Sequence, residues 1–181
     1  SAFEVLDRLI VYKSKPFVPL VSNRTNAGSQ AKFQQYEFKI YNKGKQCNLK
    51  ENVLRIEIRV KKMAFLARNL PSGASKLYLS DIGSEELWQC FQTKLNEAFG
   101  YILFEDKTIN SLKLPETDKI HYLTGCNPKT WERMSRIDRK KSSLFRKWFV
   151  GLVDTFGKEN YFNQTSQMIN EKFDILRKCN N

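Results

Sequence analysis

Histidine is almost absent from this chain of 181 residues, and the single one is His121. The four cysteines, Cys47, Cys90, Cys126 and Cys179, lie 43, 36 and 53 residues apart. Zinc sites need Cys or His ligands paired at short spacing, so the sequence argues against a Cys/His metal cluster. Widely spaced thiols are typical of reduced proteins and predict a cytoplasmic location. His121 itself is expected to be a half-buried strand residue.

Long apolar runs are also missing. No stretch of about 18 apolar residues occurs, so we expect neither a membrane span nor a membrane partner. Residues 1–4 carry no basic segment and no small-residue cleavage site, so no signal peptide is expected. The first residue is Ser rather than Met, and we therefore expect a domain cut from a longer protein.

Common nucleotide and hydrolase motifs are absent as well. The chain has no G-x-x-x-x-G-K-S/T, no G-x-G-x-x-G after a predicted strand and no G-x-S-x-G. These absences argue against ATP- or NAD-dependent chemistry and against hydrolysis by a serine triad.

The excess of positive charge is large and lies in two tracts. The net charge is +12, from 31 Lys and Arg against 19 Asp and Glu. Lys39–Lys62 and Lys129–Lys147 each hold eight cations and two acids, so each carries +6 and the rest of the chain sums to zero. Basic tracts with interleaved aromatic residues are typical of proteins that bind nucleic acid.

Period-two alternation predicts an antiparallel strand pair at the centre of the chain. Tyr36–Tyr41 alternates, a turn follows around Gly44, and Val53–Lys61 alternates again. We expect three further strands, over Phe3–Tyr12, Tyr101–Phe104 and Ile120–Leu123. Pro16 and Pro19 are expected to end regular structure, and Ser22–Gln30 is predicted to be a polar loop.

Helical signals dominate the second half of the chain. We expect helices near Met63–Asn69, from an N-cap at Ser84 to Gly100, after Asn127-Pro128, over Arg139–Phe156 and over Asn163–Lys178. The fold class is therefore α+β, a small and mostly antiparallel sheet with packed helices. A boundary near residue 125 divides a nuclease-like domain, 1–125, from a helical basic tail, 126–181, that binds DNA.

The central strand pair carries the candidate chemistry. Tyr41, Lys43 and Lys45 cluster at its turn, and the second strand presents Arg55, Glu57 and Arg59 on one face. One interpretation is a charge-balanced sheet surface. The other is a carboxylate, Glu57, that helps hold a divalent metal beside a DNA phosphate, with a tyrosine as nucleophile.

Phe38–Gln46 and Asn52–Val60 together resemble the rolling-circle replication initiators of phages and plasmids, including the filamentous-phage gene II/X type and plasmid Rep proteins. The similarity covers about residues 25–62 and, loosely, 120–178. In that family, I/F-Y-D/S-K-G-x-E precedes L-R-x-E-x-R/K. Asn42 and Gln46 depart from the first pattern.

The resemblance implies origin binding and metal-assisted attack of a tyrosine on one DNA strand, which leaves a 5′-phosphotyrosyl link. Tyr41, Tyr36 and Lys43 are the candidate catalytic residues, and Glu57 is the candidate ligand for magnesium or manganese. The candidate nucleic-acid-binding residues are Lys39, Lys43, Lys45, Arg55, Arg59, Arg133, Arg136, Arg139, Lys140, Lys141, Arg146 and Lys147.

Two rival functions remain open from the sequence. One is a non-catalytic module that binds DNA or RNA, which needs the basic tracts but no carboxylate. The other is a basic interaction protein that docks an acidic partner. Trp131 and Trp148 are either core residues or platforms on which bases stack.

Overall fold

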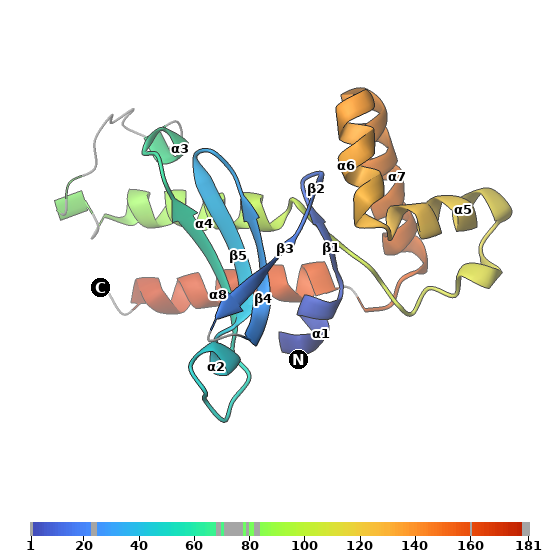
Figure 1. Ribbon diagram of the computed structural model, residues 1–181. Helices are drawn as coiled ribbons and strands as arrows, with labels where there is room; N and C mark the ends of the chain where they lie inside the picture. Colours follow the sequence, from blue (N-terminus) through green and yellow to red (C-terminus); the bar gives the residue numbers. More distant parts are fainter. Residues whose placement is uncertain are drawn as a thin grey trace.

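The computed structural model describes residues 2–22, 25–67, 70, 78, 80–81, 84–159 and 161–178. Two antiparallel sheets and a set of packed helices build the molecule (Figure 1), which confirms the predicted α+β class. No helix in these described ranges is long and apolar enough to cross a membrane.

The larger sheet has four strands, each antiparallel to its neighbour. In order across the sheet they are β3 (Val18–Ser22), β4 (Thr25–Lys32), β5 (Tyr36–Asn42) and β6 (Leu54–Val60). The predicted pairing of the two central strands is confirmed, since Phe38 lies opposite Ile58 and Ile40 lies opposite Ile56. Short helices, α2 (Lys43–Gln46) and α3 (Ala64–Ala67), flank β6.

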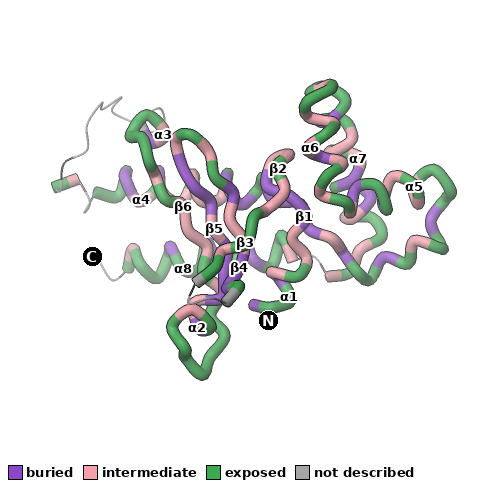
Figure 2. The backbone as a smooth tube through the Cα atoms, in the orientation of Figure 1, coloured by how far each residue is buried: buried purple, intermediate pink, exposed green. Residues whose placement is uncertain are grey.

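Two long helices cover one face of this sheet. α4 (Glu85–Phe99) and α8 (Tyr161–Lys178) lie behind it in Figure 1 and contact each other. Phe38 and Ile40 are fully buried there, in one cluster with Phe99, Ile169 and Phe173. Figure 2 shows this buried layer along β5.

A smaller sheet and a group of helices form a second core. Its strands run in the order β2 (Lys15–Pro16), β1 (Leu9–Tyr12), β7 (Ile102–Phe104). Beside them lie the turn η2 (Ser111–Lys113) and the helices α5 (Glu116–Gly125), α6 (Pro128–Ile137) and α7 (Arg139–Phe156). Trp131 is fully buried in this core, and its indole N–H donates to the Gly125 carbonyl at 2.7 Å.

Capping signals placed most helix starts correctly. The Ser84 hydroxyl accepts from the Leu87 amide at 3.3 Å and begins α4. The Asn127 side chain accepts from the Lys129 amide at 3.0 Å and begins α6. The bounds of α7 are those predicted, while α8 begins two residues earlier than predicted.

Three strand and loop predictions are wrong at the start of the chain. Phe3–Tyr12 is not one strand, because α1 (Ala2–Asp7) precedes β1 and buries Ala2 and Val5 at helical spacing. Most of Ser22–Gln30 belongs to β4 rather than to a loop. The prolines at 16 and 19 lie within β2 and β3, which are edge strands, where a missing N–H is tolerated.

A further strand prediction, over Ile120–Leu123, is also wrong. These residues belong to α5, whose first turn carries Glu116 and Asp118, acids that suit a helix N-terminus. His121 therefore lies on a helix, with its ring 4.7 Å from that of Trp148. The predicted loop over 71–74 and the predicted helical residues 68–69 lie outside the described residues.

The division of the chain near residue 125 stays a prediction. Residues from both sides of that point share the two cores. Ile169 and Phe173 of α8 pack with the large sheet, and Ile10 and Val11 of β1 pack with Trp131.

Candidate nucleic-acid interface

The face of the large sheet turned away from α4 and α8 carries the residues predicted for catalysis. Side chains alternate along a strand, so Glu37, Lys39 and Tyr41 of β5 lie on this face. Their partners across β6 are Arg59, Glu57 and Arg55, respectively. We call these six residues the charged face.

Tyr41 and Glu57 are in contact on the charged face. The Tyr41 hydroxyl donates to a Glu57 carboxylate oxygen at 3.1 Å. Lys39 Nζ lies 3.5 Å from the other oxygen of Glu57, and Arg55 Nε lies 3.5 Å from the first. Burial, and then the hydrogen bond to Glu57, raise the pKa of Tyr41. A raised pKa keeps the hydroxyl protonated, which is opposite to the shift that activates a nucleophile.

The other two candidate catalytic residues point elsewhere. Tyr36 lies on the helix-covered face of β5, where its hydroxyl is 3.2 Å from that of Tyr12. Lys43 Nζ donates to the Gln46 side chain at 2.7 Å within α2. The structure therefore brings Tyr41 to Glu57 but brings neither Tyr36 nor Lys43 to them.

The residues around Glu57 do not fit a divalent metal. A hard cation takes several oxygen ligands, whereas the neighbours of Glu57 are two cations and a hydroxyl that donates to it. In the described ranges, no three His, Cys, Asp or Glu side chains are grouped in a way that could hold a metal. The arrangement instead matches the charge-balanced interpretation.

Other cations of the first tract are paired with Glu37 or lie away from Glu57. Glu37 contacts Lys61 at 2.8 Å and Arg59 at 4.0 Å. These contacts, led by the hydrogen bond from Lys61, lower the pKa of Glu37. Lys45 is exposed on α2.

The second tract meets a turn from the start of the chain in a cleft. Two adjoining cavities of about 480 and 330 Å³ share Ser14, Ser135 and Arg139. Their walls come from the turn between β1 and β2 and from the junction of α6 with α7. We call this the basic cleft and define it by Lys13, Ser14, Lys15, Ser135, Arg136, Arg139, Ser142, Ser143 and Arg146.

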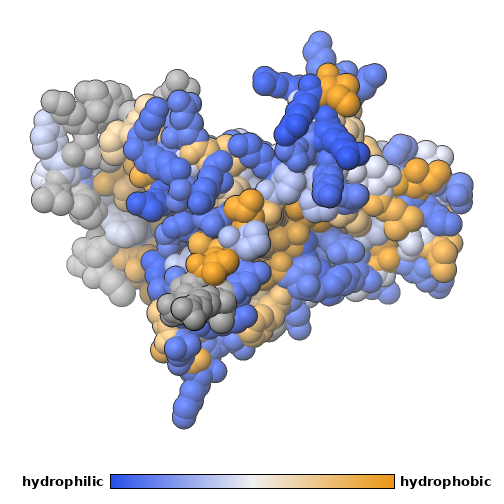
Figure 3. All heavy atoms as spheres, viewed as in Figure 1, coloured by the Kyte–Doolittle hydropathy of each residue, from blue (hydrophilic) through white to orange (hydrophobic). Residues whose placement is uncertain are grey.

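The basic cleft gathers charged and hydroxyl groups, and Ile137, Tyr101 and Trp131 line the same two cavities. It combines five cations with four serine hydroxyls. The acid among its lining residues, Glu132, is paired with Arg136 at 2.6 Å. Figure 3 shows hydrophilic side chains over the upper ends of α6 and α7, beside this cleft. Guanidinium, ammonium and hydroxyl groups of this kind are the usual partners of phosphate oxygens.

Lys13 and Lys15 are held at the cleft by aromatic rings. Lys13 has a left-handed backbone, φ 58°, at the turn. Its Nζ lies 4.4 Å from the centre of the Tyr101 ring and 5.3 Å from that of Phe33, and Lys15 Nζ lies 4.9 Å from the Phe33 ring. Cation–π contact fixes each ammonium while leaving its outer side open to an anion. The ring of Tyr101 remains 42% exposed beside Lys13.

Arg146 has a structural task within the basic cleft. Its guanidinium donates to the carbonyls of Lys13 at 3.0 Å and of Gly100 and Ile102 at 3.4 Å each. Burial lowers the pKa of Arg146. The residue thus ties the turn that carries Lys13 to α7, so it positions the cleft.

No family model, curated protein or solved structure matches this chain. The resemblance to replication initiators therefore stays a prediction.

Of the residues predicted from the second tract, three line the cleft, namely Arg136, Arg139 and Arg146. The others are exposed on α6 and α7 without lining it, namely Arg133, Lys140, Lys141 and Lys147. Trp131 is fully buried and cannot stack on a base, and Trp148 packs against His121 and Phe145.

Lys13 and Lys15 were not among the predicted residues. They lie outside both basic tracts. The sequence pattern that could have indicated them is short, since it consists of two lysines flanking Ser14 in a turn that follows a strand. The packing of that turn against α6 and its hydrogen bond from Arg146 bring them to the second tract.

Proposed function

We propose that this protein binds single-stranded DNA and that the basic cleft takes the phosphate backbone. The observation that carries the proposal is the convergence of five cations and four serines, from two distant segments, on two adjoining cavities. Charge of this density neutralises phosphates and releases counterions. The exposed ring of Tyr101 beside Lys13 supports a single strand, because an unpaired base can stack on it.

The more specific part of the proposal is a role in replication initiation of the phage or plasmid type, in the cytoplasm. The similarity of about residues 25–62 to those initiators supports DNA over RNA. An RNA-binding module and a protein that docks an acidic partner are the alternatives, and the measurements below separate them.

Salt dependence is the direct test. With one phosphate on each of Lys13, Lys15, Arg136 and Arg139, the logarithm of the binding constant should fall against the logarithm of salt with a slope of about −3 on a single strand. Fluorescence anisotropy with a labelled oligothymidine measures this slope. Competition by oligouridine distinguishes RNA from DNA, and tighter binding to polyglutamate than to oligothymidine would overturn the proposal.

DNA nicking is a second candidate function, and the contact between Tyr41 and Glu57 is the observation that favours it. A carboxylate that accepts from a tyrosine hydroxyl can take its proton. The pKa of Tyr41 is raised, however, and Glu57 is shared with Lys39 and Arg55. We therefore propose that Glu57 balances charge on the sheet.

Glu57→Gln tests that assignment because it keeps the shape and removes the charge. We expect the free energy of unfolding to fall by about 1 kcal/mol or less, as for other part-exposed ion pairs. Affinity for DNA should stay equal or rise slightly, since a negative charge is lost. Tyr41→Phe is the matched control for the hydroxyl. If the native protein cleaves supercoiled or single-stranded DNA with magnesium or manganese and both variants lose that cleavage, the charge-balance assignment is wrong.

A further inference from the structure

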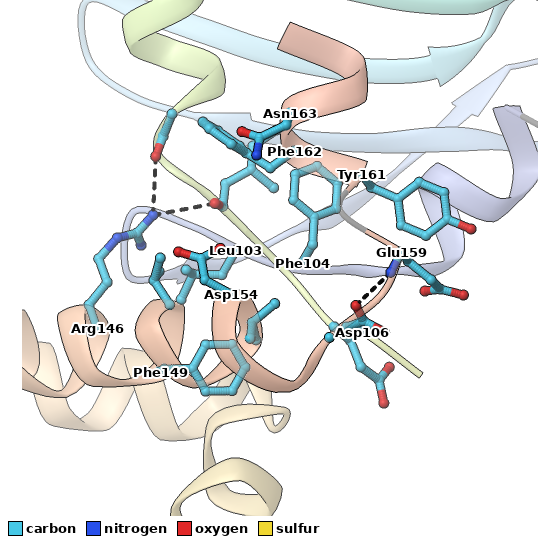
Figure 4. Close-up of a pocket in the computed structure, with 16 residues that line it drawn as sticks. Leu103, Phe104, Asp106, Arg146, Phe149, Asp154, Glu159, Tyr161, Phe162 and Asn163 are labelled. Carbon is cyan, nitrogen blue, oxygen red and sulfur yellow. Dashed lines mark hydrogen bonds between the residues drawn. The ribbon is translucent and has the colours of Figure 1, made fainter. Parts of the chain in front are cut away.

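A second cavity lies on the other side of Arg146 from the basic cleft. It has a volume of about 440 Å³ and lies between β7, α7 and the first turn of α8 (Figure 4). Arg146 lines both this cavity and the basic cleft. The cavity and the basic cleft therefore adjoin at Arg146.

Apolar residues of β7, α7 and α8 line part of the cavity. Ile102 and Phe104 of β7 and Phe149 of α7 are buried along it. Phe162 of α8 is 39% exposed at the cavity and is itself stacked on Phe99, with ring centres 5.4 Å apart. A rigid aromatic face of this kind is a platform on which a base stacks.

The carboxylates of the cavity repel phosphate and accept hydrogen bonds. Asp154 extends from α7 toward β7 (Figure 4) and makes no hydrogen bond or ion pair with other residues of the described ranges. Glu105 and Glu159 add carboxylates to the lining, and Glu159 is paired with Arg8 at 2.9 Å. A phosphate is disfavoured beside these acids, whereas a neutral group that donates N–H bonds fits.

We propose that this cavity binds one unpaired guanine of the DNA strand held in the basic cleft. This assignment rests on the proposed DNA binding, and it adds a preference for one base to that function. Guanine alone among the DNA bases presents two adjacent donors, N1–H and N2–H, on its Watson–Crick edge, and a carboxylate accepts both. Asp154 supplies that carboxylate and Phe162 supplies the stacking face. Single-stranded bases are read in this way, by stacking and by hydrogen bonds to the exposed edge.

The test compares oligothymidines of about ten nucleotides that carry one central guanine or one central adenine. We expect the native protein to prefer the guanine probe by about tenfold, the lower range for a bidentate contact. Asp154→Asn replaces one acceptor oxygen with a donor, so the preference should disappear while affinity for plain oligothymidine is kept. Asp174→Asn on α8 removes the same charge away from the cavity and should leave the preference intact.

The outcomes separate the two proposals. Failure to bind any of the probes would overturn DNA binding itself. Equal binding of the guanine and adenine probes by the native protein, or an unchanged preference in Asp154→Asn, would overturn the guanine site while leaving the basic cleft standing. Asp154 is exposed, so thermal unfolding of Asp154→Asn should match that of the native protein and show that the fold is kept.

Discussion

Replacing Lys15, Arg136 and Arg139 together with alanine should weaken single-stranded DNA binding by about 100-fold near 0.1 M salt. Each of these cations lines the basic cleft from the turn after β1 or from the junction of α6 with α7. A partly screened contact with phosphate contributes roughly 1 kcal/mol, and three of them give about two orders of magnitude. The salt slope should fall by about 2 at the same time. Anisotropy titrations at several salt concentrations measure both effects.

A matched triple variant separates the cleft from net charge. Lys140, Lys141 and Lys147 are exposed on α7 and do not line the cleft. Their replacement with alanine removes the same three charges, yet we expect a loss of only about threefold, from the weaker general field. Equal losses in the two triple variants would show that the cleft has no special role. Arg146 is left unchanged in both because it holds three backbone carbonyls.

Asp106→Ala should lower the free energy of unfolding by about 3 kcal/mol, the largest stability effect expected here. Asp106 is 3% exposed at the end of β7. Its carboxylate accepts from the Thr108 amide at 2.8 Å, from the Thr108 hydroxyl, and from the Glu159 amide at 2.9 Å. Alanine leaves these donors without a partner in a buried place. Urea unfolding at pH 7 measures the loss.

The same carboxylate predicts how stability depends on pH. Burial alone would raise the pKa of Asp106, but hydrogen bonds from Thr108, Glu159 and Lys158 outweigh it and lower that pKa. A carboxyl with a lowered folded pKa stabilises the protein above its unfolded value, near 3.9, and the contribution disappears as the pH falls through the folded pKa. The gap in stability between native protein and Asp106→Ala should therefore narrow below about pH 4. A gap that is constant down to pH 2 would contradict this account, and Asp174→Ala serves as an exposed control with little effect at any pH.

Local signals predicted the helices well because their caps act over a few residues. Ser84, Asn127 and Gly100 are found where the sequence put them. Alternation likewise placed β5 and β6 and their pairing. The weaker predictions, β4 and α5, concern segments whose conformation depends on packing: β4 is polar but is hydrogen-bonded on both sides, and α5 buries Tyr122 in the second core.

The candidate site was predictable only in part, and for a geometric reason. Tyr36 and Tyr41 are five residues apart in one strand, so period two places them on opposite faces, and the sequence alone could have shown this. The alternation along a strand could not predict that Lys13 and Arg139 line the same cavity. Their segments are more than a hundred residues apart, and only the folded chain brings the turn after β1 to α7.

The contact between Asp106 and the Glu159 amide has a topological consequence. It brings together the two ends of residues 107–158, the segment that contains α5, α6 and α7. The segment therefore leaves and rejoins the rest of the chain at neighbouring positions, and further contacts hold it against the smaller sheet. The bonds of Arg146 to Lys13, Gly100 and Ile102 are one such contact, and the packing of Ile10 and Val11 with Trp131 is another. The width of the basic cleft is therefore set by contacts that do not themselves need to touch DNA.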